Sequence, residues 1–118
     1  MLHLVLGASP KERRYSYKAT EVLSKNGFHV YPVGIRKGEI LGIEINQEYP
    51  TDKKIDTIAM YLSAENQEKY RELIFNNLPQ RIIFNPGTYN PPFQKDLADK
   101  GVEVVNDCVL LMVQGQRY

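Results

Sequence analysis

The chain has 118 residues, a formal net charge of +1 and an apolar share of 42%, values typical of one compact globular domain over residues 1–118. A net charge so close to zero argues against nucleic acid or a membrane surface as the partner, and no apolar segment is long enough to cross a bilayer. Cys108 is the only cysteine, so no internal disulfide can form, and we expect a cytoplasmic protein.

The first half of the chain alternates between strand and helix patterns. Leu2–Leu6 is a short apolar run closed by a turn signal, which predicts a strand buried on both faces. Apolar residues at helical spacing then predict a helix that begins at Tyr15 and ends at Gly27. The β-branched and aromatic run Phe28–Val33 predicts a second strand, and a glycine-punctuated loop with a short strand or turn at 40–45 follows.

The second half repeats this alternation. Ile55–Leu62 predicts a strand, and Ser63 is placed to cap a helix with an apolar stripe. Arg81–Phe84 predicts the next strand, Asn90 precedes a proline-led helix, and Val102–Val105 predicts the last strand. The pattern therefore predicts an α/β fold with a doubly wound, mostly parallel five-stranded sheet, which binds ligands at the carboxyl ends of its strands.

The segment after the first strand offers groups that suit a phosphate. Gly7 lets the backbone approach a ligand, and the amides at the start of the next helix point into the same space. Lys11, Arg13 and Arg14 add positive charge, and the Ser9 hydroxyl can donate to a phosphate oxygen. A tight turn followed by a solvated charge run, with Ser16 capping the helix, explains the same residues, since one glycine falls short of a GxGxxG pattern.

The segment after the second strand separates NAD from more highly phosphorylated nucleotides. An NAD enzyme places a carboxylate near this point to hold the ribose hydroxyls. Here Arg36 and Lys37 come first, and the first carboxylate after the strand is Glu39. Because cations attract a phosphate on the sugar, the segment favours coenzyme A or NADP, with a solvated loop as the alternative.

Catalytic and metal-binding patterns are sparse. His3 and His29 lie inside predicted strands, where packing or surface roles are more common than acid–base chemistry. The sequence has no GxSxG, HExxH, CxxC or P-loop pattern, and its metal-ligand residue types are scattered, so we expect no catalytic residue and no metal. Cys108 follows a strand end, and a small packed side chain is favoured there over a reactive thiol.

An ordered series of short segments resembles the CoA-binding domain family. The segments are Val5–Pro10, Arg14–Ser16, Gly27–Val33, Gly38–Gly42, Ile55–Ile58, Asn85–Asn90 and Gly101–Cys108. They look most like the small stand-alone bacterial members, and more distantly like the nucleotide-binding domain of the succinyl-CoA ligase alpha subunit. In that ligase a further domain supplies the catalytic histidine, so ligase activity is not implied for a chain of this length.

The resemblance implies a Rossmann-like domain that binds coenzyme A or an acyl-CoA, with NADP less favoured. It implies that residues 7–9 face the diphosphate, that residues 33–34 flank the adenosine and that residues 37–38 reach the sugar phosphate. Asn85, Gly87 and Asn90 would line the opposite wall. Together with the strand-end reasoning, the expected binding residues are Gly7, Ala8, Ser9, Pro10, Arg14, Ser16, Val33, Gly34, Arg36, Lys37, Gly38, Leu62, Asn85, Pro86, Gly87, Asn90 and Cys108.

Three functions remain open at this point. The first is a CoA-binding carrier, sensor or regulatory module without catalysis, whose partner is a nucleotide-type small molecule. The second is a small enzyme that uses NADP or an acyl-CoA thioester, with Cys108 or Tyr89 taking part. The third is an interaction module with a vestigial nucleotide site, and assembly into a homo-oligomer is compatible with all three.

Overall fold

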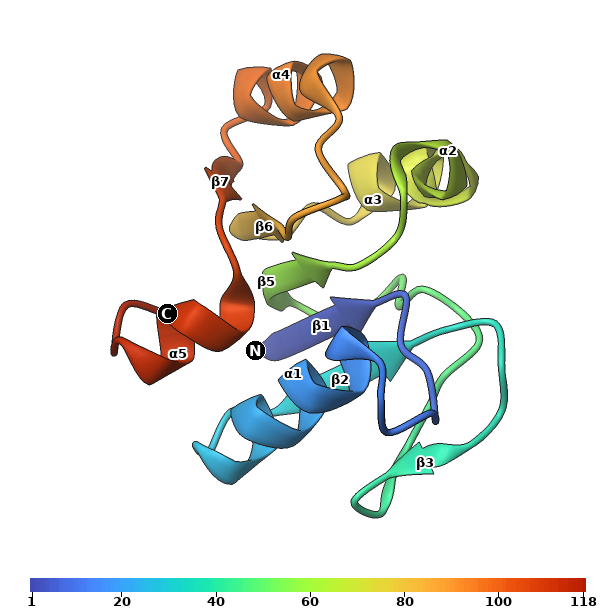
Figure 1. Cartoon of the computed structure of the whole chain (residues 1–118). Helices are drawn as coiled ribbons and strands as arrows, with labels where there is room; N and C mark the ends of the chain where they lie inside the picture. The colour runs from blue at the N-terminus through green and yellow to red at the C-terminus, as the bar shows by residue number, and fades with distance from the viewer.

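Five parallel strands form the central sheet of the computed structural model, which describes residues 1–118. They are β1 (Leu2–Leu6), β2 (Val30–Val33), β5 (Ile55–Met60), β6 (Arg81–Phe84) and β7 (Glu103–Asn106). Their spatial order is β2-β1-β5-β6-β7, and every neighbouring pair is parallel (Figure 1). Strand order therefore reverses at β1, which has β2 on one side and β5 on the other, and a ligand site is expected at this switch point.

Helices cover both faces of the sheet (Figure 1). One face carries α1 (Tyr15–Lys25) and α5 (Val109–Gln114), and the other carries the remaining helices. Those are α2 (Ala64–Gln67), the 3-10 turn η1 (Glu68–Tyr70), α3 (Arg71–Asn76) and α4 (Pro91–Asp99). A small antiparallel hairpin, β3 (Glu39–Ile40) with β4 (Ile43–Glu44), follows β2. The Rossmann-like, doubly wound α/β fold is confirmed.

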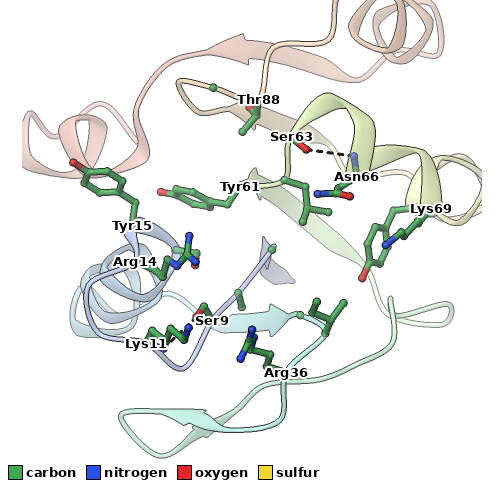
Figure 2. A pocket seen from close by; sticks show the side chains of 18 of the residues that line it. Ser9, Lys11, Arg14, Tyr15, Arg36, Tyr61, Ser63, Asn66, Lys69 and Thr88 are labelled. Carbon is green, nitrogen blue, oxygen red and sulfur yellow. Dashed lines mark hydrogen bonds between the residues drawn. The ribbon is translucent and has the colours of Figure 1, made fainter.

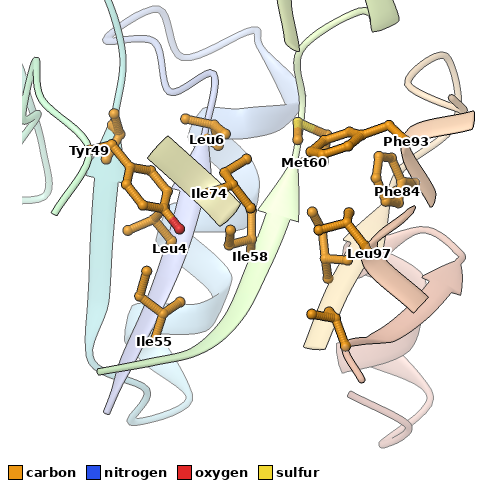
Figure 3. Packing of buried hydrophobic residues seen from close by; sticks show 13 residues of the cluster. Leu4, Leu6, Tyr49, Ile55, Ile58, Met60, Ile74, Phe84, Phe93 and Leu97 are labelled. Atoms are coloured by element: carbon orange, nitrogen blue, oxygen red, sulfur yellow. The ribbon is translucent and has the colours of Figure 1, made fainter. Parts of the chain in front are cut away.

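Side chains that alternate along each strand divide the core in two. Leu4 and Leu6 of β1 join the cluster under α3 and α4, whereas Val5 between them joins the cluster under α1 and α5. Figure 3 shows the first cluster, where Phe84 and Phe93 meet edge to face. The continuous apolar runs in the sequence are explained by this burial on both faces.

Some element boundaries differ from the sequence-based prediction. β5 ends at Met60 instead of Leu62, because its partner β1 ends at Leu6, where Gly7 turns the chain with φ +98°. The helix that was expected to run on from Ser63 is divided into α2, η1 and α3. Helix α5 was not predicted, because its short, almost wholly apolar sequence has no helical periodicity.

None of these helices combines the length and the apolar character that crossing a bilayer requires.

Candidate functional site

A cleft of about 510 Å³ opens at the carboxyl edge of the sheet, beside the switch point. Its lining comes from the β1–α1 connection, the loop after β2, the segment from the end of β5 to η1, and the loop after β6 (Figure 2). Four connections that are far apart in the sequence therefore meet around one hollow, as parallel α/β sheets require.

The structure brings many of the expected binding residues into this cleft, and leaves others outside its lining. Those in the lining are Gly7, Ala8, Ser9, Arg14, Ser16, Gly34, Arg36, Leu62, Pro86 and Gly87. Those outside it are Pro10, Val33, Lys37, Gly38, Asn85, Asn90 and Cys108. The lining also includes Lys11, whose positive charge the sequence analysis had noted, and residues that were not expected: Tyr15, Ile35, Tyr61, Ser63, Asn66, Lys69, Tyr70 and Thr88.

The floor of the cleft is made where the β1–α1 connection touches the end of β2. The amides of Gly7 and Ala8 both donate to the Val33 carbonyl, each at 2.9 Å. A Cβ on Gly34 would lie 2.2 Å from the Ala8 carbonyl oxygen, so only glycine allows the two loops to come this close. The Gly7 and Ala8 amides are therefore used within the fold and are not free to bind a ligand.

Amides that are free of protein partners are found at the start of α1. Arg14 is the N-cap residue, its side chain makes no capping hydrogen bond, and the first turn has no acidic residue. The amides of Tyr15, Ser16 and Tyr17 donate to no group of the protein. Unpartnered amides and the positive end of the helix dipole together form a site suited to an anion.

Positive side chains surround the cleft without negative ones. Lys11, Arg14, Arg36 and Lys69 line it, and none of them makes an ion pair. No aspartate or glutamate is in the lining. Figure 2 shows Lys11 and Arg14 beneath Tyr15, with Lys69 on the opposite wall. Since a concave surface of one charge sign concentrates counter-ions, this cleft favours a ligand with several negative charges.

The wall opposite α1 is held by a buried glutamine. Gln67 is fully buried, and its Nε2 donates to the carbonyls of Leu62, at 2.9 Å, and Thr88, at 2.7 Å. Its Oε1 accepts a hydrogen bond from Nδ2 of Asn90 at 3.0 Å. One carboxamide thus joins the end of β5, helix α2 and the loop after β6, and it fixes the positions of Ser63 and Thr88 at the cleft.

Asn85 has a similar structural task. Its Nδ2 donates to the Met60 carbonyl and its Oδ1 accepts from the Val109 amide, each at 2.9 Å. The side chain is buried and both of its polar ends have protein partners. Asn85 therefore ties β5 and β6 to the start of α5, beneath the cleft wall.

Comparison with known proteins agrees with this geometry. The family model described as a CoA binding domain matches residues 3–114. The chain belongs to the CoA-binding domain family.

Solved structures share the fold of this CoA-binding family member. One, described as an uncharacterized protein, has 38% sequence identity and a TM-score of 0.95, and the match covers 99% of this chain and 97% of that one. A hypothetical protein from Pyrococcus horikoshii OT3 is 24% identical, with a TM-score of 0.85 and coverage of 97% and 81%. A Thermus thermophilus protein is 21% identical, with a TM-score of 0.87 and coverage of 99% and 90%. No curated protein matches the chain.

Tyr61 and Cys108 are two potentially reactive side chains in or near the cleft of this CoA-binding family member. Tyr61 lines the cleft, but its hydroxyl is buried without a hydrogen-bond partner, and burial raises the pKa of this phenol. Cys108 is the N-cap residue of α5, outside the lining, and its amide donates to the Asp107 carboxylate at 2.7 Å. Tyr61 therefore remains a protonated phenol near neutral pH.

Proposed function

We propose that this chain binds coenzyme A, or a related adenine nucleotide with a phosphate on its sugar, in the cleft at the carboxyl edge of the sheet. The observation that carries the proposal is the charge of the lining, which has four cations without ion pairs and no carboxylate. Coenzyme A is complementary, because it carries a diphosphate and a phosphomonoester, the latter with a charge of about −1.5 to −2 at neutral pH. Membership of the CoA-binding domain family supports the same ligand.

The diphosphate is assigned to the start of α1. There the Tyr15 and Ser16 amides have no protein partner, and Lys11 and Arg14 supply charge. Arg36, in the loop after β2, would bind the sugar phosphate, since it lines the cleft whereas its neighbour Lys37 does not. The ligand would then lie across the switch point, with its phosphorylated sugar on the β2 side.

We further propose that residues 1–118 act as a single binding module, such as a carrier, a sensor or a regulatory partner, without catalysis of their own. The hydroxyls of the lining, such as those of Ser9, Ser63 and Thr88, have no histidine or carboxylate beside them in the cleft to activate them. The single cysteine fits the reducing cytoplasm, in which we place the protein.

Isothermal titration calorimetry with coenzyme A and dephospho-CoA tests this function. We expect tighter binding of coenzyme A, because dephospho-CoA lacks the sugar phosphate. Arg14→Glu should weaken the binding of both ligands by about tenfold or more, since it places a negative charge beside the diphosphate. Arg13→Glu is the matched control, because Arg13 is exposed one residue earlier and outside the lining. If the wild-type protein gives no binding heat with coenzyme A and none with dephospho-CoA, the proposal is contradicted.

A further inference from the structure

We propose that Lys69 is a specificity-determining residue of this cleft, which binds the sugar phosphate of the nucleotide together with Arg36. The inference rests on the proposed function, and deepens it by assigning a residue from the segment after β5, where the sequence analysis proposed no cation for the ligand. Three observations support it: Lys69 lines the cleft, its ammonium makes no ion pair, and a phosphomonoester carries more than one negative charge.

The backbone turn that carries Lys69 is held by the protein before any ligand arrives. Lys69 lies in η1, two residues after Gln67, whose side chain makes three hydrogen bonds in the interior. Asn66 and Tyr70 line the cleft beside it. Figure 2 shows Lys69 on the wall that faces Lys11 and Arg14, with Arg36 below the cleft between them. Because the backbone of this turn is anchored, only the Lys69 side chain has to be ordered when it meets an anion.

The charge of Lys69 is not used within the fold. Glu65 is one helical turn earlier, at the spacing that favours a glutamate–lysine pair, and Glu68 is the preceding residue. Neither makes an ion pair with Lys69. Elsewhere this chain does form pairs at the same spacing, between Glu21 and Lys25 and between Lys95 and Asp99. Lys69 instead lines the cleft, where there is no carboxylate to neutralise it.

The arithmetic of charge assigns Lys69 to the phosphomonoester. The diphosphate already has Lys11, Arg14 and the unpartnered amides of α1. A phosphomonoester carries about −1.5 to −2 at neutral pH, so a single cation leaves it undercompensated. Arg36 comes from the β2 side of β1 and Lys69 from the segment after β5, so the two can approach one phosphate from different directions. The forked guanidinium and the compact ammonium then act as complementary donors.

Calorimetry on Lys69→Gln with coenzyme A and with dephospho-CoA is the test. We expect the variant to bind coenzyme A about tenfold more weakly, and to bind dephospho-CoA almost as the wild type does. Lys69→Arg should recover most of the affinity for coenzyme A, because it keeps the charge. Lys100→Gln is the control for loss of a surface lysine, since Lys100 is exposed at the end of α4 and outside the cleft.

Each outcome decides the inference. Equal loss of affinity for both ligands would place Lys69 at the diphosphate and overturn it, as would unchanged affinity for coenzyme A. Thermal unfolding of Lys69→Gln without ligand should match the wild type, because the side chain is exposed. If the wild-type protein binds neither ligand, the proposed function itself fails and the inference falls with it. If the wild type binds coenzyme A and the variant does so equally well, only the role of Lys69 is lost.

Discussion

At the switch point, a single residue can be required by a close contact between backbone segments and not by ligand chemistry. Gly7, directly after β1, was expected to let a ligand approach the backbone. At Gly34, directly after β2, it is the β1–α1 connection that approaches. A Cβ there would lie 2.2 Å from the Ala8 carbonyl oxygen and 3.1 Å from its carbon, both backbone atoms that cannot rotate away. The residue therefore sets how closely the β1–α1 connection and the loop after β2 meet, and so shapes the floor of the cleft.

We expect Gly34→Ala to destabilise the protein by about 3 kcal/mol, because the added methyl group forces two backbone segments apart. Gly42→Ala is a suitable comparison: Gly42 has φ +79° but nothing within 4 Å of an added Cβ, so only local strain of about 1 to 2 kcal/mol applies. Urea unfolding of both variants measures the difference. A Gly34→Ala protein as stable as Gly42→Ala would show that the loops can separate without penalty.

At the scale of elements, the wall of the cleft depends on a buried amide. The segment after β5 was expected to be one helix with an apolar stripe, and it is α2, η1 and α3. Gln67 lies at the end of α2 with its side chain turned inward, where an apolar residue would satisfy the stripe but not the carbonyls of Leu62 and Thr88. The segment that follows β5 is therefore held by the hydrogen bonds of Gln67 at the part of it nearest the cleft.

Gln67→Leu should cost roughly 2 to 5 kcal/mol of stability, because it leaves buried carbonyl groups and the Asn90 amide without partners. We expect the larger change to be local: amides of the 85–90 loop should exchange hydrogen faster, and affinity for coenzyme A should fall. Gln114→Leu is the matched control, since Gln114 is exposed and makes no side-chain hydrogen bond. Hydrogen exchange read by mass spectrometry separates the two results; an unchanged 85–90 loop would contradict this view of the wall.

At the scale of the whole molecule, the two ends of the chain meet at the edge of the sheet opposite the cleft (Figure 1). Nδ1 of His3 lies 2.7 Å from the Tyr118 hydroxyl, and both rings pack against Phe28. Burial lowers the pKa of His3 below its ordinary value of 6.5, an effect that the nearby Asp56 carboxylate only partly offsets, and Arg81 adds to it. Burial raises the pKa of Tyr118 to about 12, so its phenol stays protonated beside the neutral ring.

This pairing predicts that the protein loses stability on mild acidification. Because the folded-state pKa of His3 is depressed, the unfolded chain binds the proton more readily as the pH falls from above 6.5 toward and through the folded-state value. The free energy of unfolding should therefore decrease between pH 7.5 and pH 5. His3→Gln should flatten this dependence, whereas His29→Gln, at an exposed position, should leave it as in the wild type. Urea unfolding across this pH range gives the measurement, and equal slopes for the two variants would refute the role of His3.

The sequence by itself determined the α/β class and the parallel sheet, and it predicted the edge of the sheet at which we propose that a ligand binds. It could do so because the period of apolar residues is a local property, and because parallel strands joined by helices must all end at one edge. The cations after the first two strands, and the order of the family segments, also pointed to a phosphorylated nucleotide. Both are properties of the sequence that need no knowledge of tertiary contacts.

Only the tertiary structure decided which of these residues share the cleft. Arg36 lines it and its neighbour Lys37 does not, while Lys69 lines it from a segment in which the sequence analysis named no binding cation. Asn85 and Asn90, expected on the cleft wall, make their side-chain hydrogen bonds to Met60, Val109 and Gln67 instead. These outcomes depend on contacts between segments far apart in the chain, whose distances and directions are set by packing and leave no periodic trace in the sequence.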